Sequence, residues 1–139
     1  MRLYLDTSFL AALFIEADAF NGQATIFFAE VNEAMVVSDF AATEFASVIA
    51  RVTRMKVIKD TEARAIFDSF DTWRARFTDE EGVVSSDIRV AEVIIRRLDV
   101  NLRAPDAINI AVALRLGASL VTFDRRMTQN ARALGVAVG

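Results

Sequence analysis

The chain has 139 residues, 54% of them hydrophobic, and it contains neither histidine nor cysteine. Without these two residue types it cannot build ordinary zinc sites, Ser-His or Cys-His nucleophilic sites, or disulfides. The net charge of −3 and the pI near 5.0 argue mildly against a protein that binds nucleic acid through bulk positive charge.

The length fits one domain over residues 1–139 with a single core. The longest apolar run, residues 9–15, is far shorter than the ~20 residues that cross a bilayer, so no membrane segment is expected. No signal-peptide pattern stands at the start, and the lack of cysteine fits a cytoplasmic protein. The surplus of apolar residues, with a mean hydropathy of +0.33, indicates a subunit or partner contact.

Short apolar runs alternate with helical patterns along the chain. In chain order we predict a strand at 2–5, helices at 8–15 and 21–32, a strand at 34–38, helices at 39–55 and 60–77, a short strand at 82–85, helices at 87–98 and 105–116, a strand at 119–123 and a helix at 126–134. Residues 136–138 can add a final edge strand. Strands separated by helices indicate an α/β fold, here a three-layer α/β/α domain whose central parallel sheet has four or five short strands.

Three aspartates are expected at one edge of this sheet. Asp6 and Asp124 follow directly after predicted strands, and Asp106 lies in the first turn of the helix that begins at Pro105. Ligands of open α/β sheets bind outside the carboxyl ends of the strands, where these helices also begin. The three carboxylates are therefore candidates for one site.

Glu44 is the fourth candidate acid. It falls on the apolar stripe of the 39–55 helix, between Ala41 and Val48 at helical spacing. Burying an unpaired carboxylate costs several kcal/mol, so an acid at this position needs a cation. Because the chain offers only oxygen ligands of the usual kinds, Mg²⁺ or Mn²⁺ is the expected metal.

Each acid also has a structural alternative. Asp6 and Asp124 can serve as turn or helix-capping residues, and Asp106 can complement a helix dipole. The convergence of four acids on one edge, with no lysine close to any of them in sequence, favours a shared site.

The segments "LYLDTSFLAALF", "SDFAATEFASVIARV" and "LRAPDAINIAVALRLGASLVTFDRRM" resemble PIN-domain ribonucleases, in particular the VapC-type toxins of VapBC toxin–antitoxin systems. The resemblance does not extend through residues 55–98. It implies that Asp6, Glu44, Asp106 and Asp124 are the catalytic and metal-binding residues, with Ser8 and Thr122 as supporting hydroxyls. Asn109 stands where many relatives carry histidine and receives no catalytic role, and the bulky Phe123 can shape substrate access.

The resemblance further implies a Mg²⁺- or Mn²⁺-dependent endoribonuclease that leaves a 5′-phosphate and a 3′-hydroxyl. Its implied partners are the RNA substrate, a cognate antitoxin and a second copy in a homodimer. RNA would be held by local basic residues, for which the candidates are Arg125 and Arg126, directly after Asp124, and Arg51 and Arg54, on the Glu44 helix. Solvated faces or salt bridges are the alternative roles of these arginines.

Two other functions are compatible with a strand-end acid pattern. One is a non-catalytic PIN-fold binding module that uses its acids only structurally. The other is a phosphoryl-transfer domain of receiver or haloacid-dehalogenase type, which requires adjacent acids or a D-x-D pattern after the first strand. The chain has D-T-S at 6–8 instead, so the second alternative ranks well below the nuclease.

Overall fold

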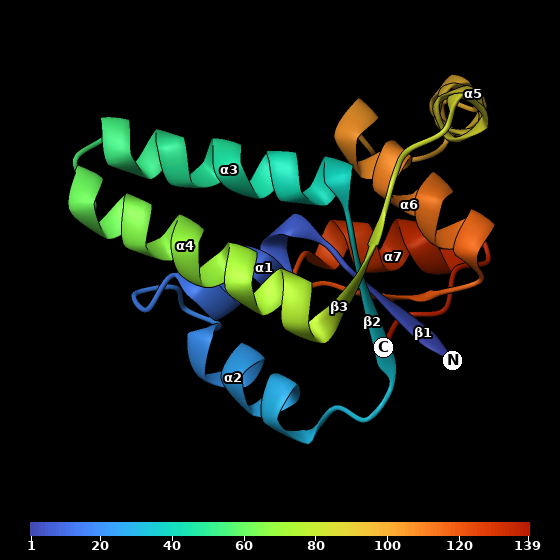
Figure 1. Cartoon of the computed structure of the whole chain (residues 1–139). Coiled ribbons are helices and arrows are strands. Elements are labelled where there is room, and N and C mark those ends of the chain that lie inside the picture. The colour runs from blue at the N-terminus through green and yellow to red at the C-terminus, as the bar shows by residue number, and fades with distance from the viewer.

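A parallel four-stranded sheet runs through the centre of the molecule, with its strands in the order β3-β2-β1-β4 (Figure 1). The structure is a computed structural model that describes residues 1–139. The strands are β1 (Arg2–Leu5), β2 (Ala34–Ser38), β3 (Thr78–Glu81) and β4 (Ser119–Val121). The helices are α1 (Thr7–Phe14), α2 (Asn21–Glu30), α3 (Asp39–Arg54), α4 (Asp60–Phe77), α5 (Ser85–Arg96), α6 (Ala104–Leu116) and α7 (Arg125–Ala133).

Alternation along the strands divides the core between the two faces of the sheet. In β1, Leu3 and Leu5 pack into one apolar cluster together with residues of α1 to α4, whereas Tyr4 packs into a second cluster with residues of α5 to α7. This follows from the two-residue period of a strand, which turns successive side chains to opposite faces. The predicted three-layer α/β/α architecture and parallel sheet are confirmed, with four strands and seven helices.

The third strand lies elsewhere than predicted. The expected strand at 82–85 is wrong, and β3 instead follows α4 directly and pairs with β2. Its sequence, "TDEE", has no apolar pattern because an edge strand need not bury its side chains, and charge is favoured there. Arg2 on β1 helps to hold it, because its Nη2 lies 3.6 Å from Asp79 Oδ2 and 3.1 Å from Glu81 Oε1. The expected last strand is reduced to a single parallel bridge between Leu120 and Val138.

Very short connections bring helix starts to the carboxyl edge of the sheet. Asp6 alone separates β1 from α1, and Ser38 both ends β2 and caps α3, with its hydroxyl accepting from the Ala41 N–H at 3.0 Å. At its other end, α6 stops at Gly117 with φ of 61°, the left-handed conformation predicted for a glycine after a helix. None of the helices has both the length and the apolar character needed to span a membrane.

Candidate active site

Asp6 is the most deeply placed of the four acids. It caps α1, where Oδ1 accepts a hydrogen bond from the Phe9 N–H at 3.0 Å. The Ser8 hydroxyl donates to the same oxygen at 2.7 Å and lies 3.0 Å from the Thr122 hydroxyl. The two hydroxyls predicted to support the site therefore form a connected pair beside Asp6.

The electrostatic environment of Asp6 opposes its ionisation. The residue is only 5% exposed, and burial raises the pKa of its carboxyl to about 6. Hydrogen bonds from nearby donors lower that pKa in part, and the Asp124 carboxylate raises it further. None of the ion pairs of the chain involves Asp6. A cation bound next to this carboxylate would therefore stabilise its charged form strongly.

Glu44 lies in the second turn of α3 and is half-buried, not enclosed as its place on the apolar stripe suggested. Its Oε1 accepts hydrogen bonds from the Thr7 hydroxyl at 2.9 Å and from Asn109 Nδ2 at 2.7 Å. The Asn109 amide also donates to the Pro105 carbonyl at 3.1 Å. Asn109 thus ties Glu44 to the first turn of α6, which contains Asp106.

Asp124 takes the capping role that is its structural alternative, and Asp106 lies in the first turn of α6, where an acid also complements the helix dipole. Asp106 Oδ2 accepts from the Arg103 N–H, and Asp124 Oδ1 accepts from the Met127 N–H, each at 3.1 Å. The Arg126 Nη2 lies 3.7 Å from Asp106 Oδ2, the one ion pair made by any of the four acids. Capping and a place at the sheet edge are therefore compatible in this fold, because the helices begin at that edge.

Three of the carboxylates share a pattern of contacts. In Glu44, Asp106 and Asp124 the hydrogen bonds and ion pairs with the protein go to one oxygen only, namely Oε1, Oδ2 and Oδ1, whereas Asp6 is held at Oδ1 and also interacts with the Thr122 side chain. The protein thus orients these three carboxylates through one oxygen and makes no hydrogen bond to the other. Each oxygen without a protein hydrogen bond can accept an external ligand.

The spacing of the acids is looser than the sequence suggested. No group of three or more acidic side chains is arranged to hold a metal ion together, so the structure does not show the closely packed quartet that we expected. Mg²⁺ is commonly bound through one or two carboxylates, with waters and substrate phosphates as its other ligands. The residues present fit such an ion, because their donors are oxygens and three of the four acids have no cationic partner.

Phe123 holds the β4–α7 connection in place. Its ring stacks between those of Phe9, at 5.9 Å between centroids, and Phe20, at 4.7 Å. Its backbone N–H donates to the Ser8 hydroxyl at 3.0 Å. Phe123, which directly precedes Asp124, is therefore anchored to α1 and to the start of α2.

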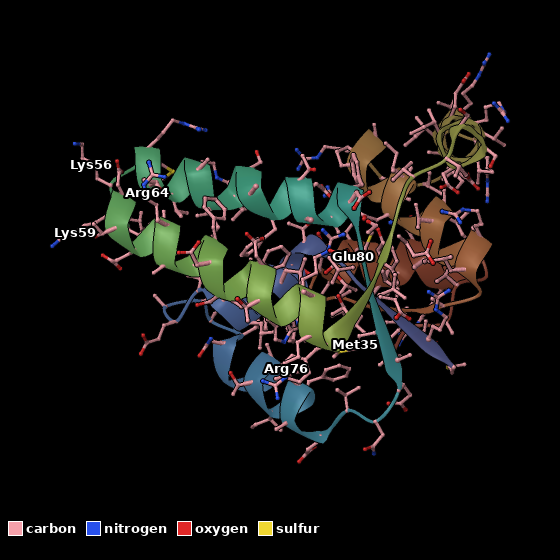
Figure 2. All side chains as sticks on the ribbon, in the orientation of Figure 1. Met35, Lys56, Lys59, Arg64, Arg76 and Glu80 are labelled. Atoms are coloured by element: carbon pink, nitrogen blue, oxygen red, sulfur yellow. The ribbon has the colours of Figure 1, made fainter.

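The four candidate arginines lie in two different places. Arg125 and Arg126 begin α7 beside the acids, and Arg125 is exposed. Arg51 and Arg54 lie on α3, which runs away from the sheet edge (Figure 1), about 10 and 15 Å further along the helix than Glu44. Figure 2 places Lys56 and Lys59 at this same distant end of the α3–α4 pair.

Two polar residues of the site received no role from the sequence. Thr7 is part of the D-T-S motif but no role is predicted for it, and no catalytic role is predicted for Asn109 because asparagine cannot titrate like histidine. The spacing of Asn109, three residues after Asp106 on one helix, was a usable signal, because residues so spaced lie on the same helical face. The contact of both residues with Glu44 required the tertiary structure, since Glu44 is on another helix.

Comparison with known protein families identifies the fold. The family model described as PIN domain matches residues 3–133, nearly the whole chain. The chain belongs to the PIN-domain family. A comparison with curated proteins gave no match.

Solved structures of similar fold cover nearly the whole chain. VapC20 from Mycobacterium tuberculosis, described as a Sarcin-Ricin loop cleaving toxin, has a TM-score of 0.75 at 22% identity, covering 97% of this chain and 96% of that one. FitAcB from Neisseria gonorrhoeae has a TM-score of 0.76 at 13% identity, and the match covers 98% of this chain and 95% of that one. VapBC2 from Rickettsia felis, bound to a DNA fragment from its promoter, has a TM-score of 0.72 at 12% identity. That match covers 100% of this chain and 98% of that one. At these identities the likeness establishes a shared VapC-like fold.

Proposed function

We propose that this PIN-domain protein is an endoribonuclease that depends on Mg²⁺ or Mn²⁺ and acts as the toxin of a toxin–antitoxin pair. The observation that supports the proposal is the Asp6 carboxylate at the sheet edge, which is 5% exposed, has no ion pair and lies close enough to the Asp124 carboxylate for that charge to raise its pKa. A buried carboxylate without a cationic partner is costly, and a bound divalent ion would remove that cost.

The four acids have distinct roles in this proposal. Asp6, Asp106 and Asp124 would hold the metal, directly or through water, and Glu44 would orient the attacking water or hold a second ion. When bound, the metal supplies an activated water and neutralises charge on the phosphate and the leaving oxygen. The Ser8 hydroxyl keeps Asp6 oriented by its hydrogen bond and is itself contacted by the Thr122 hydroxyl.

Incubation of the purified protein with total RNA, with MgCl₂ or with EDTA, tests the proposed activity. We expect new 5′-phosphate ends at defined positions in the Mg²⁺ sample and none in EDTA. Stabilisation by Mg²⁺ without cleavage of any RNA would instead support the non-catalytic PIN-fold module. Cleavage in EDTA at an unchanged rate would contradict the metal-dependent mechanism.

RNA binding is proposed to rely on the arginines beside the acids. Replacing Arg125 by glutamine should reduce the slope of log Kd against log salt by roughly 0.7 for single-stranded RNA, because one phosphate contact is lost. Fluorescence anisotropy of a labelled RNA in EDTA measures the slope without cleavage. Arg64→Gln is the matched control, since it removes the same charge from an exposed residue at the distant end of the α3–α4 pair (Figure 2), and it should leave the slope unchanged. Equal slopes for wild type and Arg125→Gln would remove Arg125 from the interface.

The antitoxin partner and the homodimer are supported by the shared fold alone. Two of the similar structures are of VapBC2 and FitAcB, and a third is of FitAB bound to a DNA fragment. Light scattering of the purified chain tests the homodimer, which should have twice the 15.4 kDa of one chain. A toxin should also arrest growth when expressed alone, and Asp6→Asn should not.

A further inference from the structure

A chain of buried polar side chains runs through the core to Glu44. It begins at Ser38, whose hydroxyl accepts from the Ala41 N–H at 3.0 Å and lies 2.6 Å from the Tyr4 hydroxyl. Tyr4 donates to Asn109 Oδ1, and Asn109 Nδ2 donates to Glu44 Oε1 at 2.7 Å. The chain therefore crosses from the end of β2 through β1 and α6 to the carboxylate on α3.

The protons of this chain have only one consistent arrangement. Asn109 Nδ2 faces two groups that only accept hydrogen bonds, Glu44 Oε1 and the Pro105 carbonyl. If the amide were reversed, Oδ1 would face these two acceptors and neither hydrogen bond could form. Since Asn109 Oδ1 can only accept, the Tyr4 hydroxyl must donate its single proton to Asn109. The Ser38 hydroxyl must then donate to Tyr4. Each donor is used, and every link from Ser38 through Tyr4 and Asn109 donates toward Glu44, while the second Asn109 amide proton goes to the Pro105 carbonyl.

The burial of these residues shows that the chain is a costly feature of the core. Tyr4 and Ser38 are 0% exposed and Asn109 is 3% exposed, and Tyr4 packs on the face of the sheet lined by Val36 and Leu120. Apolar side chains would fill this layer without the cost of desolvating polar groups. A fully satisfied buried network does what apolar packing cannot, because it holds its members in one geometry.

The hydrogen-bonded series of side chains ends at Glu44, a residue of the candidate site. Thr7 and Asn109 both donate to Glu44 Oε1, and Oε2 accepts no hydrogen bond from the protein. Two donors on one oxygen fix the rotation of the carboxylate and keep that oxygen occupied. Only Oε2 is then free to act on water or metal.

We propose that Ser38, Tyr4 and Asn109 are positioning residues that hold Glu44 through Oε1 and so present Oε2 to the reaction. This inference rests on the proposed nuclease function. Asn109, for which the sequence predicts no catalytic role, positions Glu44 as a neutral donor that needs no titration. Tyr4 acts from within the core without contacting substrate or metal.

Tyr4→Phe tests the proposal, because it removes one hydroxyl and keeps the ring. We expect kcat for RNA cleavage to fall about 10- to 100-fold, the usual effect of removing an outer partner of a functional ligand, with KM within twofold of wild type. Ile49→Val is the control, since it trims a buried side chain on the same helix as Glu44. It should lower Tm by a similar few degrees and leave kcat unchanged. Equal kcat in Tyr4→Phe and Ile49→Val would overturn the proposal.

A second measurement does not depend on cleavage. Both Asn109 side-chain amide protons are hydrogen-bonded, so NMR should find them slow to exchange in the wild type and in Ile49→Val. In Tyr4→Phe, exchange should become at least about tenfold faster because Oδ1 loses its donor. Unchanged protection in Tyr4→Phe would overturn the positioning role even if kcat fell. If the wild type cleaves no RNA, the proposed function fails, whereas the exchange data still decide whether the chain holds the Asn109 amide on Glu44.

Discussion

Replacing Asp6 by asparagine should abolish RNA cleavage and, at the same time, stabilise the metal-free protein at neutral pH. Asparagine keeps an oxygen that can accept from the Phe9 N–H and the Ser8 hydroxyl, so the cap of α1 should survive. It loses the negative charge that would hold the metal. We expect activity to fall by more than about 100-fold, since even outer partners of metal ligands cost 10- to 100-fold.

The gain in stability follows from the raised pKa of Asp6. Because the folded pKa is about 6 and the ordinary value is 3.8, the folded protein binds this proton more tightly than the unfolded chain does. Stability is therefore lost as the pH rises between these two values, by about 3 kcal/mol in total. Asparagine has no proton to lose, so the variant should be more stable than wild type above pH 6 by up to about that amount.

Urea unfolding in EDTA at pH 4 and pH 8 measures this difference. The advantage of Asp6→Asn should be present at pH 8 and should shrink toward pH 4. Adding MgCl₂ at pH 8 should stabilise the wild type and have little effect on the variant, because only the wild type has the Asp6 carboxylate. Asp68→Asn, which removes an exposed acid on α4, should show neither effect. A variant less stable than wild type at pH 8 would contradict the electrostatic interpretation of Asp6.

Replacing Arg115 by alanine should destabilise the fold by about 3 kcal/mol, the low end of the range for breaking a buried ion pair. Arg115 Nε and Nη2 donate to the two oxygens of Asp87 at 2.9 and 3.1 Å, and the Asp87 side chain is only 2% exposed. Arg115 also donates to the Gly82 carbonyl at 3.0 Å. Without the guanidinium, a buried carboxylate on α5 is left uncompensated, and the β3–α5 connection loses its link to α6.

Urea unfolding at neutral pH measures the loss. The control is Arg96→Ala, which breaks an exposed pair with Glu92 at 2.8 Å and should cost no more than about 0.5 kcal/mol. Adding Asp87→Asn to Arg115→Ala should recover part of the stability, because the unpaired charge is removed. If Arg115→Ala costs no more than Arg96→Ala, the pair does not stabilise the packing of α5 on α6.

Most of the fold could be predicted from local patterns. The apolar runs of β1 and β2 and the capping signals at Ser38, Pro105 and Gly117 are properties of a few adjacent residues. β3 could not be predicted in this way. Its charged residues form a strand because β2 offers a free edge and because Arg2 pairs with its acids, and both partners are distant in sequence.

The candidate site also has features that the sequence predicts and features that depend on residues distant in sequence. The sequence by itself determined that Asp6, Asp106 and Asp124 lie at one sheet edge, since strand ends and helix starts must meet there in a parallel α/β fold. Only the tertiary structure decided how far apart the carboxylates are, which oxygen of each is held, and that Tyr4 and Asn109 reach Glu44 through the core. Periodicity assigns a residue to a face or an edge, whereas distances between side chains on different elements depend on how the packed layers settle against one another.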